Sequence, residues 1–205
     1  MKKTLCTVLT SSALALCAGF APPALAAENI SVVYTGVATP NTRATPALQA
    51  FTDWCNAASG ACYPTVQQPV FDTTTGRRRG MVHVWGAFPF NAGTIFPGAI
   101  CFSEFMVFVL DEGELYTHTA PNGTCGAFMD PLLKPPQHTD LGATAVIAGG
   151  GDGVIAGGTN KYKHWSGTFT DRVFVGFGAP TSGVGGIIYY DQLLFVISPD
   201  GKSHD

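Results

Sequence analysis

Hydrophobic and polar residues alternate with a period of two along most of this chain from residue 66 onward. Such alternation is typical of antiparallel β-strands, because successive side chains point to opposite faces. Turn residues at 72–76 and 111–113 separate neighbouring runs and predict hairpins. Including an earlier β-branched run, the predicted strands are 30–34, 66–73, 77–87, 99–110, 114–119, 143–148, 165–177 and 185–198.

One segment near the start of the chain has helical spacing instead. Thr45 is a typical N-cap residue, and Pro46 suits the first helical position. Apolar side chains then recur at helical spacing at Leu48, Phe51 and Cys55. The pattern predicts a short helix that ends near 59–60, where glycine can adopt the left-handed cap conformation.

Two stretches interrupt the strands. Residues 148–170 are dense in glycine, which indicates bulges, bends or close backbone approach, and we expect a crossing between two strands there. Residues 121–137 are rich in proline and predict a long excursion from the sheet. Seven or more strands with one helix and no βαβ rhythm predict an all-β sandwich or barrel.

Residues 1–26 have the pattern of a secretory signal peptide: two lysines, an apolar run over 5–20 and small residues at a cleavage site. We therefore expect a secreted or periplasmic protein with a single domain over 27–205. Without the signal peptide, 9 of the 11 Lys and Arg remain against 14 Asp and Glu, a formal charge of −5 (9 − 14). This balance argues against nucleic acid or an anionic membrane as partner. No later run is apolar and long enough for a membrane span.

Four cysteines follow the signal peptide: Cys55, Cys62, Cys101 and Cys125. An even number in an exported chain favours disulfides, with three possible pairings. We expect Cys55–Cys62 and Cys101–Cys125, because each pair closes a local loop. A catalytic thiol or a zinc site is the alternative, which the spacing disfavours because neither pair is C-x-x-C and no histidine lies in ligand register.

Three motifs follow one another in the middle of the chain. They are Phe71-Asp72…Gly76-Arg77…Gly80, the strand 108–115, and Gly157-Gly158-Thr159-Asn160-Lys161-Tyr162…Gly167-Thr168. This pattern resembles the allene oxide cyclase and dirigent protein superfamily, whose members have an Asp…Gly…Gly hairpin and a GGTGxYxxxxG segment in the same order. Asn160 stands where the superfamily usually has glycine, and asparagine can also adopt a positive φ.

The resemblance covers roughly residues 66–176 and implies a closed antiparallel eight-stranded barrel with an apolar lumen. Such a barrel is just wide enough for one small ligand. The resemblance also implies a homodimer or homotrimer and an isomerase or cyclase without a cofactor, acting on a small apolar or aromatic molecule. A non-catalytic lipocalin-like carrier and a structural or interaction protein with a filled barrel are alternatives with the same fold.

Glu104 is the first candidate for acid–base catalysis. It shares a strand face with Phe102, Met106 and Phe108. If this face lines the lumen, loss of hydration raises the pKa of Glu104 toward the range useful for catalysis. The alternative places Glu104 outside, paired with the arginines at 77–79, since the opposite strand face is also apolar.

His83 is the second catalytic candidate, on a strand face with Met81 and Trp85. A histidine in an apolar strand is more often a hydrogen-bonded core residue than a catalyst. The side chains that we expect to contact a ligand are Trp85, Phe102, Met106, Phe108 and Tyr189.

The last strand has Tyr189 and Asp191 on one face and Tyr190 and Gln192 on the other. Tyrosines at such positions ordinarily pack in a core and bond a partner through the hydroxyl. No metal site is expected, because the remaining histidines lack metal-ligand spacing. No dinucleotide cofactor is expected either, because the glycine pattern at 151–156 is not followed by a helix.

Overall fold

The computed structural model describes residues 28–58, 62–87, 99–129, 141–179, 184 and 186–198, and antiparallel strands dominate them. The predicted signal peptide lies outside the described residues. The elements are β1 (Glu28–Val37), β2 (Thr39–Pro40), α1 (Gln49–Ala57), β3 (Cys62–Asp72), β4 (Arg78–Ala87), β5 (Ile100–Leu110), β6 (Gly113–Phe128), β7 (Ala145–Gly158), the 3-10 helix η3 (Asn160–Tyr162), β8 (Thr168–Phe177) and β9 (Ile187–Ser198). The predicted all-β class with one short helix is thus confirmed for this part of the chain.

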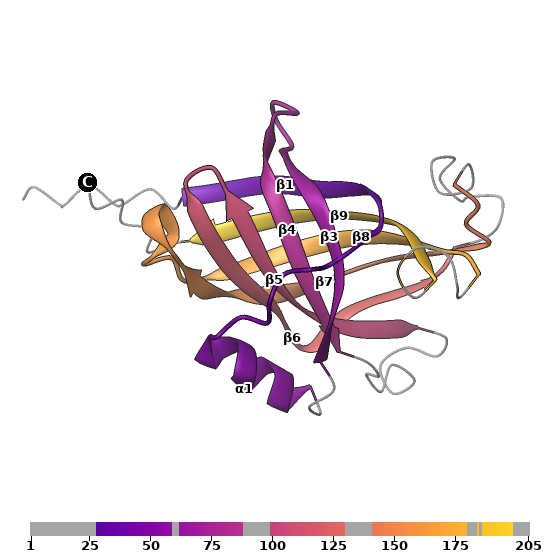
Figure 1. The fold of residues 1–205 in the computed structure, drawn as a ribbon, viewed down its shortest axis with the longest axis horizontal. Coiled ribbons are helices and arrows are strands. Elements are labelled where there is room, and N and C mark those ends of the chain that lie inside the picture. The colour runs from indigo at the N-terminus through magenta and orange to yellow at the C-terminus, as the bar shows by residue number, and fades with distance from the viewer. Residues whose placement is uncertain are drawn as a thin grey trace, which may run out of the picture.

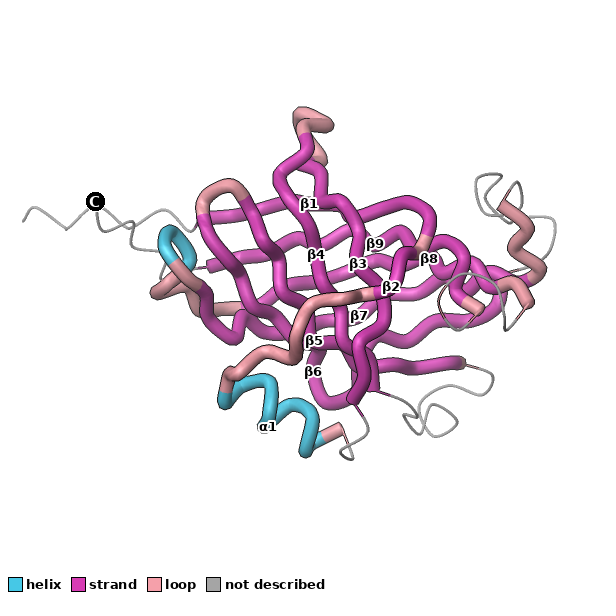
Figure 2. Tube along the Cα trace, viewed as in Figure 1, coloured by secondary structure: helices cyan, strands magenta, loops and turns pink. Residues whose placement is uncertain are grey.

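The strands form one antiparallel sheet in the order β1-β9-β8-β7-β6-β5-β4-β3-β2. Strand β1 pairs with β9 along residues 28–37, and it also pairs with β3 from Val32 to Tyr34. Because strands far apart in this order meet at β1, the sheet curls into a partial ring. In the view of Figures 1 and 2, β3 and β4 cross in front of β8 and β9.

The inner face of this ring holds the main hydrophobic core. Alternate residues of each strand point inward, so β5 contributes Phe102, Met106 and Phe108, and β9 contributes Tyr190 and Leu194. The period of two in the sequence therefore places these side chains on the buried face, and a polar residue in the same register becomes buried with them.

The outer face of β4 and β5 is also buried, because α1 packs against it (Figure 1). The ring of Phe51 lies 5.9 Å from the ring of Trp85 and 5.1 Å from that of Phe105, both in edge-on contacts. Trp54 of α1 joins the same cluster. This second layer explains why both faces of β5 are apolar.

Helix α1 begins later than the sequence predicts. Its first residue is Gln49, and its N-cap is Leu48, which makes no side-chain hydrogen bond to the helix end. The Leu48 side chain instead packs against the outer cluster. The predicted cap at Thr45 and Pro46 is wrong because packing against the sheet, rather than capping chemistry, determines where this short helix starts.

The two predicted interruptions are largely strand. Strand β6 continues beyond the predicted end at 119 as far as Phe128, with a register shift between Thr119 and Thr124. Of the predicted excursion at 121–137, residues 121–128 thus belong to β6, and residues 130–137 lie outside the described residues. In the glycine-dense stretch 148–170, residues 148–158 belong to β7, and the connection to β8 is limited to residues 159–167, which include η3. A Cβ at Gly149 would lie 2.2 Å from the backbone oxygen of Cys125, so close backbone approach accounts for glycine at that position.

Both expected disulfides are present. Cys55–Cys62 joins α1 to β3, and Cys101–Cys125 joins paired positions of β5 and β6. Disulfides are typical of oxidising compartments outside the cytoplasm. In the described part of the chain, no helix is long and apolar enough to cross a membrane.

The glycine segment shared with the superfamily motif forms the end of β7 and η3. Asn160 has a φ of +50°, which fits a position that favours glycine. Tyr162 is fully buried, and its hydroxyl donates to Glu112 at 2.8 Å. Arg79 pairs with the same carboxylate at 2.5 Å. These contacts give Tyr162 a structural role.

Candidate functional site

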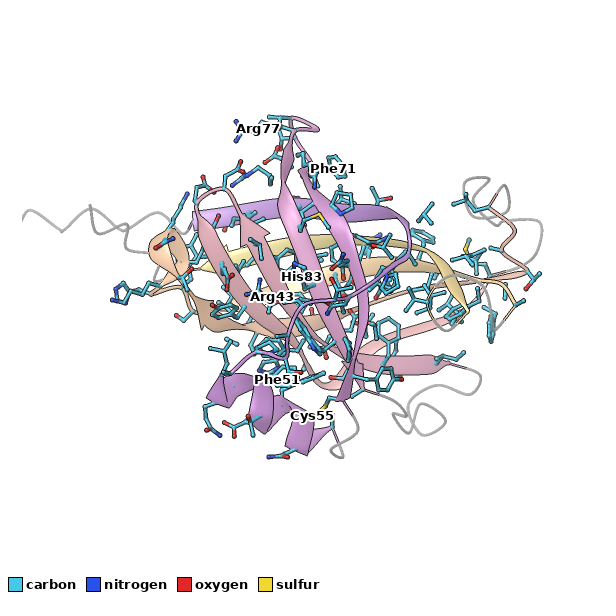
Figure 3. The ribbon with its side chains drawn as sticks, viewed as in Figure 1. Arg43, Phe51, Cys55, Phe71, Arg77 and His83 are labelled. Carbon is cyan, nitrogen blue, oxygen red and sulfur yellow. A yellow bond between two sulfur atoms is a disulfide. The ribbon has the colours of Figure 1, made fainter. Side chains whose placement is uncertain are left out.

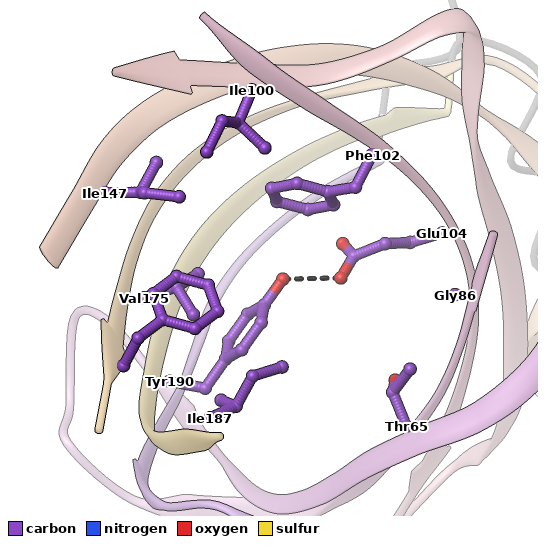
Figure 4. A pocket seen from close by; sticks show the side chains of 10 residues that line it. Thr65, Gly86, Ile100, Phe102, Glu104, Ile147, Val175, Ile187 and Tyr190 are labelled. Atoms are coloured by element: carbon purple, nitrogen blue, oxygen red, sulfur yellow. Dashed lines mark hydrogen bonds between the residues drawn. The ribbon is translucent and has the colours of Figure 1, made fainter. Parts of the chain in front are cut away.

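An apolar pocket opens at one end of the ring, between β3, β4 and β5 on one side and β7, β8 and β9 on the other (Figure 4). The space between its side chains measures about 420 Å³ including the open mouth, of which about 40 Å³ can be reached by the centre of a water molecule. The lining residues are Thr65, Gly86, Ile100, Phe102, Glu104, Ile147, Val175, Phe177, Ile187 and Tyr190.

Glu104 is the one acidic side chain in this lining. It comes from the middle of β5, where the inward register between Phe102 and Met106 forces it toward the core, and only 4% of it is exposed. The hydroxyl of Tyr190 donates a hydrogen bond of 2.5 Å to Glu104 Oε1 (Figure 4). Glu104 Oε2 is buried and has no hydrogen-bond partner among the described residues.

Burial raises the pKa of Glu104 to about 8, because the ionised carboxylate would lose its hydration in this apolar setting. The hydrogen bond from Tyr190 opposes the rise by favouring the carboxylate, whereas the nearby carboxyl of Asp171 adds to it. At neutral pH the Glu104 carboxyl is therefore mostly protonated. It can act as a hydrogen-bond donor and as an acid.

Tyr190 is fixed as the partner of Glu104 by the packing of β9 against β1. Its ring stacks on the ring of Tyr34, with centroids 5.7 Å apart and an angle of 17° between the planes. Burial, followed by the nearby Glu104 carboxyl, holds the pKa of Tyr190 well above the usual value of a tyrosine. Tyr190 therefore stays a neutral donor over the whole physiological pH range.

A second polar group lies in the core beside this pair. The Asp171 carboxyl from β8 accepts hydrogen bonds from Thr124 Oγ1 at 2.9 Å and from Gln192 Nε2. The hydroxyl of Tyr34 in turn donates to Gln192 Oε1. Burial raises the pKa of Asp171, and its hydrogen bonds oppose the rise. Among the described residues, the ring thus contains two buried carboxyl groups, Glu104 and Asp171.

The residues predicted to contact a ligand do not all line the pocket. Phe102 lines the pocket with Glu104, whereas Met106 and Phe108 lie on the same strand face within the inner cluster. Tyr189 belongs to β9, but its side chain lies outside the described residues.

His83 and Trp85 lie on the outer face of β4, away from Glu104. His83 Nδ1 is 3.2 Å from Asn41 Oδ1, and Figure 3 shows His83 beside Arg43. Loss of hydration, followed by the charge of Arg43, lowers the pKa of His83. Trp85 packs with the α1 cluster. Val82 and Val84 take the inward positions of β4. Strand alternation therefore places His83 and Trp85 together on the outer face.

The alternative pairing of Glu104 with the arginine hairpin does not occur. Arg77 pairs with Asp111 at 2.9 Å, and Arg79 pairs with Glu112 at 2.5 Å. Glu104 lies on the inner face instead.

Sequence reasoning missed Asp171 as a core residue and did not identify the partner of the Tyr190 hydroxyl. Asp171 carries the same signal that identified Glu104: an acid at an inward position between the buried Phe169 and Val173. The role of Tyr190 depends on its position across the ring from Glu104, which no local pattern indicates.

A second hollow lies on the outer face between α1 and strands β5 and β6. Trp54 Nε1 donates to Ser103 Oγ at 2.8 Å, and the hydroxyls of Ser103 and Thr119 are 2.6 Å apart. His118 Nδ1 lies 2.9 Å from the backbone oxygen of Thr119. Because these groups satisfy one another, we assign this hollow to the packing of α1.

Within the described ranges, no three His, Cys, Asp or Glu side chains are placed to hold a metal ion. Comparison with known protein families finds no match for this chain, and comparison with curated proteins also finds none. The likeness to the allene oxide cyclase and dirigent superfamily stays a prediction from its motifs.

Proposed function

We propose that the sheet closes into an eight-stranded barrel whose pocket binds a small apolar or aromatic molecule and promotes its isomerisation or cyclisation without a cofactor. The pairing of β1 with both β9 and β3 supports closure. Eight strands leave an interior just wide enough for side chains or for one small ligand. Export through the predicted signal peptide is part of the proposal, and the two disulfides support an oxidising compartment.

The observation that carries this proposal is the buried carboxyl group of Glu104, with one unpartnered oxygen, at the inner wall of an apolar pocket. Since Tyr190 donates to Glu104 Oε1, the carboxyl proton belongs on Oε2, the oxygen without a partner. A ligand with an oxygen acceptor, such as a carbonyl, would satisfy that proton. A ligand carboxylate could also accept that proton, but its negative charge is disfavoured in an apolar ring that already holds the acidic groups of Glu104 and Asp171.

The proposed catalysis combines restraint with proton transfer. The apolar walls hold the ligand in one folded conformation, which removes part of the entropy cost of cyclisation. The Oε2–H bond of Glu104 breaks as the proton passes to the ligand oxygen, and Tyr190 stabilises the carboxylate that forms. The proton returns to Oε2 when the product forms, so the net change is an isomerisation. Proton transfer of this kind contributes about 10²- to 10⁴-fold to a rate.

A carrier or a structural barrel would share the fold, but neither function requires a buried carboxyl group. Burial of an ionisable group costs stability, and groups with strongly shifted pKa values cluster at functional sites. The apolar pocket alone would suffice for a carrier. The inward position of Glu104 therefore favours the enzyme over both alternatives.

Binding of matched probes tests the proposal. 2-Acetylnaphthalene and 2-ethylnaphthalene have similar shapes, but only the first has an acceptor oxygen. We expect the protein to bind the ketone about 3- to 10-fold more tightly, as one added hydrogen bond implies. The preference should disappear above the pKa of Glu104 and in Glu104→Ala, which has no donor.

Native mass spectrometry of protein purified from its own host then identifies a retained molecule as the candidate substrate. Its conversion by the wild type but not by Glu104→Gln supports catalysis. Unchanged conversion by the variant would remove Glu104 from the mechanism, and tight retention without conversion would leave the carrier function.

A further inference from the structure

The second buried carboxyl, Asp171, is unused in the mechanism above. Only 6% of it is exposed, and it lies on β8, away from the pocket lining. A buried acid without a role is costly, since burial of a charge requires compensating partners. Its contacts indicate what it does.

Hydrogen-bond donors at Asp171 favour its negative charge and oppose the rise in pKa that burial causes. Thr124 Oγ1 at 2.9 Å and Gln192 Nε2 both donate to Asp171 Oδ2, and the backbone N–H of Gly151 also favours the charged form, whereas Oδ1 is buried without a partner among the described residues. Hydrogen bonds to the charged form of a carboxyl favour ionisation. Glu104 accepts one hydrogen bond, from the hydroxyl of Tyr190, and the Gln192 amide lies near it as a weaker second donor.

Gln192 lies between the two acids and has a fixed orientation. Tyr34 donates to Gln192 Oε1, which leaves the amide N–H groups directed toward the carboxyls. Gln192 Nε2 donates to Asp171 and also lies close enough to Glu104 to favour its ionised form. An amide does not readily pass a proton, so the coupling between the two acids is electrostatic.

We propose that Asp171 is a positioning residue of the proposed reaction: it carries the negative charge of the inner carboxyl pair, and that charge keeps the proton on Glu104. The inference rests on the proposed role of Glu104 as the acid. It follows the rule that two acids in unequal surroundings take unequal roles. The direction agrees with the effect of Asp171 on Glu104, whose pKa it raises.

Three other titratable groups act on the pair. Tyr190 from β9 donates to Glu104, and Tyr34 from β1 orients Gln192. Asp152 from β7 is exposed and raises the pKa of Asp171 by its charge. The two tyrosines are neutral donors at neutral pH, so among these groups the charge nearest to Glu104 is that of Asp171.

Carboxyl ¹³C NMR of the full chain tests the inference without any substrate. At pH 7 we expect Glu104 to be protonated and Asp171 ionised in the wild type. In Asp171→Asn, which keeps the side-chain volume, we expect the Glu104 midpoint to move down by about one pH unit. Asp53→Asn removes the same charge from the exposed face of α1 and should leave the midpoint unchanged.

A protonated Asp171 at pH 7 in the wild type, or an unmoved Glu104 midpoint in Asp171→Asn, would overturn the inference. The wild-type measurement decides the question even if Asp171→Asn fails to fold. The naphthalene probes report on the proposed function separately: loss of the ketone preference with a normal Asp171 effect refutes the function and leaves the charge arrangement intact.

Discussion

Replacing Glu104 with glutamine should make the protein more stable at neutral pH. Glutamine has the same shape and can still accept the hydrogen bond from Tyr190, but it has no proton to lose. The wild-type carboxyl has a pKa of about 8 in the folded chain against 4.5 as the ordinary value. At neutral pH the folded chain therefore keeps the Glu104 proton, whereas the unfolded chain releases it.

The size of the effect follows from proton linkage. Below pH 4.5 both states are protonated, and the carboxyl does not affect the free energy of unfolding. Between pH 4.5 and about 8 only the folded state keeps the proton, so stability falls with rising pH by about 1.4 kcal/mol per unit. The loss reaches roughly 3 kcal/mol at pH 7 and levels off above pH 8. Glu104→Gln lacks this loss.

Urea denaturation followed by tryptophan fluorescence measures the difference. We expect Glu104→Gln to exceed the wild type by about 3 kcal/mol at pH 7 and to match it within about 1 kcal/mol at pH 4.5. Asp53→Asn, at an exposed acid, is the control and should follow the wild type throughout. Parallel curves for wild type and Glu104→Gln across this range would refute the burial of a neutral Glu104.

Three further predictions concern the rest of the sheet. Replacing Cys101 and Cys125 with alanine opens a loop with a sequence separation of 24, which should lower the free energy of unfolding by about 3.5 kcal/mol in urea; a loss below about 1 kcal/mol would contradict the loop-closure estimate. Gly149→Ala places a Cβ 2.2 Å from a backbone oxygen, whereas Gly178→Ala meets its nearest neighbour at 3.4 Å. We expect the first to cost about 2 kcal/mol and the second little, and equal melting temperatures would argue against the close approach. Asn160 has a φ of +50°, so Asn160→Gly should leave the melting temperature unchanged. Asn160→Val should lower the stability by about 1–2 kcal/mol. An Asn160→Val variant as stable as the wild type would exclude that backbone conformation.

Local pattern predicts much of this fold because strand alternation and loop closure are local. That Phe102 and Glu104 share one face of β5 follows from a period of two, but which face is inward does not, because both faces are apolar. The disulfides follow from the short separations of their cysteines. Long-range features do not follow in this way: the pairing of β1 with β3 joins segments that no local signal connects.

The wrong predictions arise where tertiary contacts override local preference. Proline and glycine in 121–128 and 149–158 favour breaks, yet β6 and β7 continue because their neighbours approach closely enough to pair with them. Helix α1 starts at Gln49 because Leu48 packs on the sheet. Only the fold shows that α1 covers the outer face of β4 and that His83 lies there.

The candidate site also combines local and long-range information. Glu104 is visible in the sequence as a lone acid among large apolar residues, and Asp171 has the same pattern on β8. The contact of Glu104 with Tyr190 spans 86 residues and depends on the curl of the sheet. Sequence alone therefore nominates the acid but not its partner.

Infrared spectroscopy of the wild type at pH 7, with Glu104→Gln as the reference, detects a protonated carboxyl group inside the protein. The C=O stretch of a neutral carboxylic acid is well separated from that of a carboxylate. We predict a neutral-acid band that is present in the wild type, absent from Glu104→Gln, and lost as the pH rises through about 8. A wild-type spectrum with only the carboxylate band of Glu104 at pH 7 would contradict a buried acid at this position and the chemistry proposed for it.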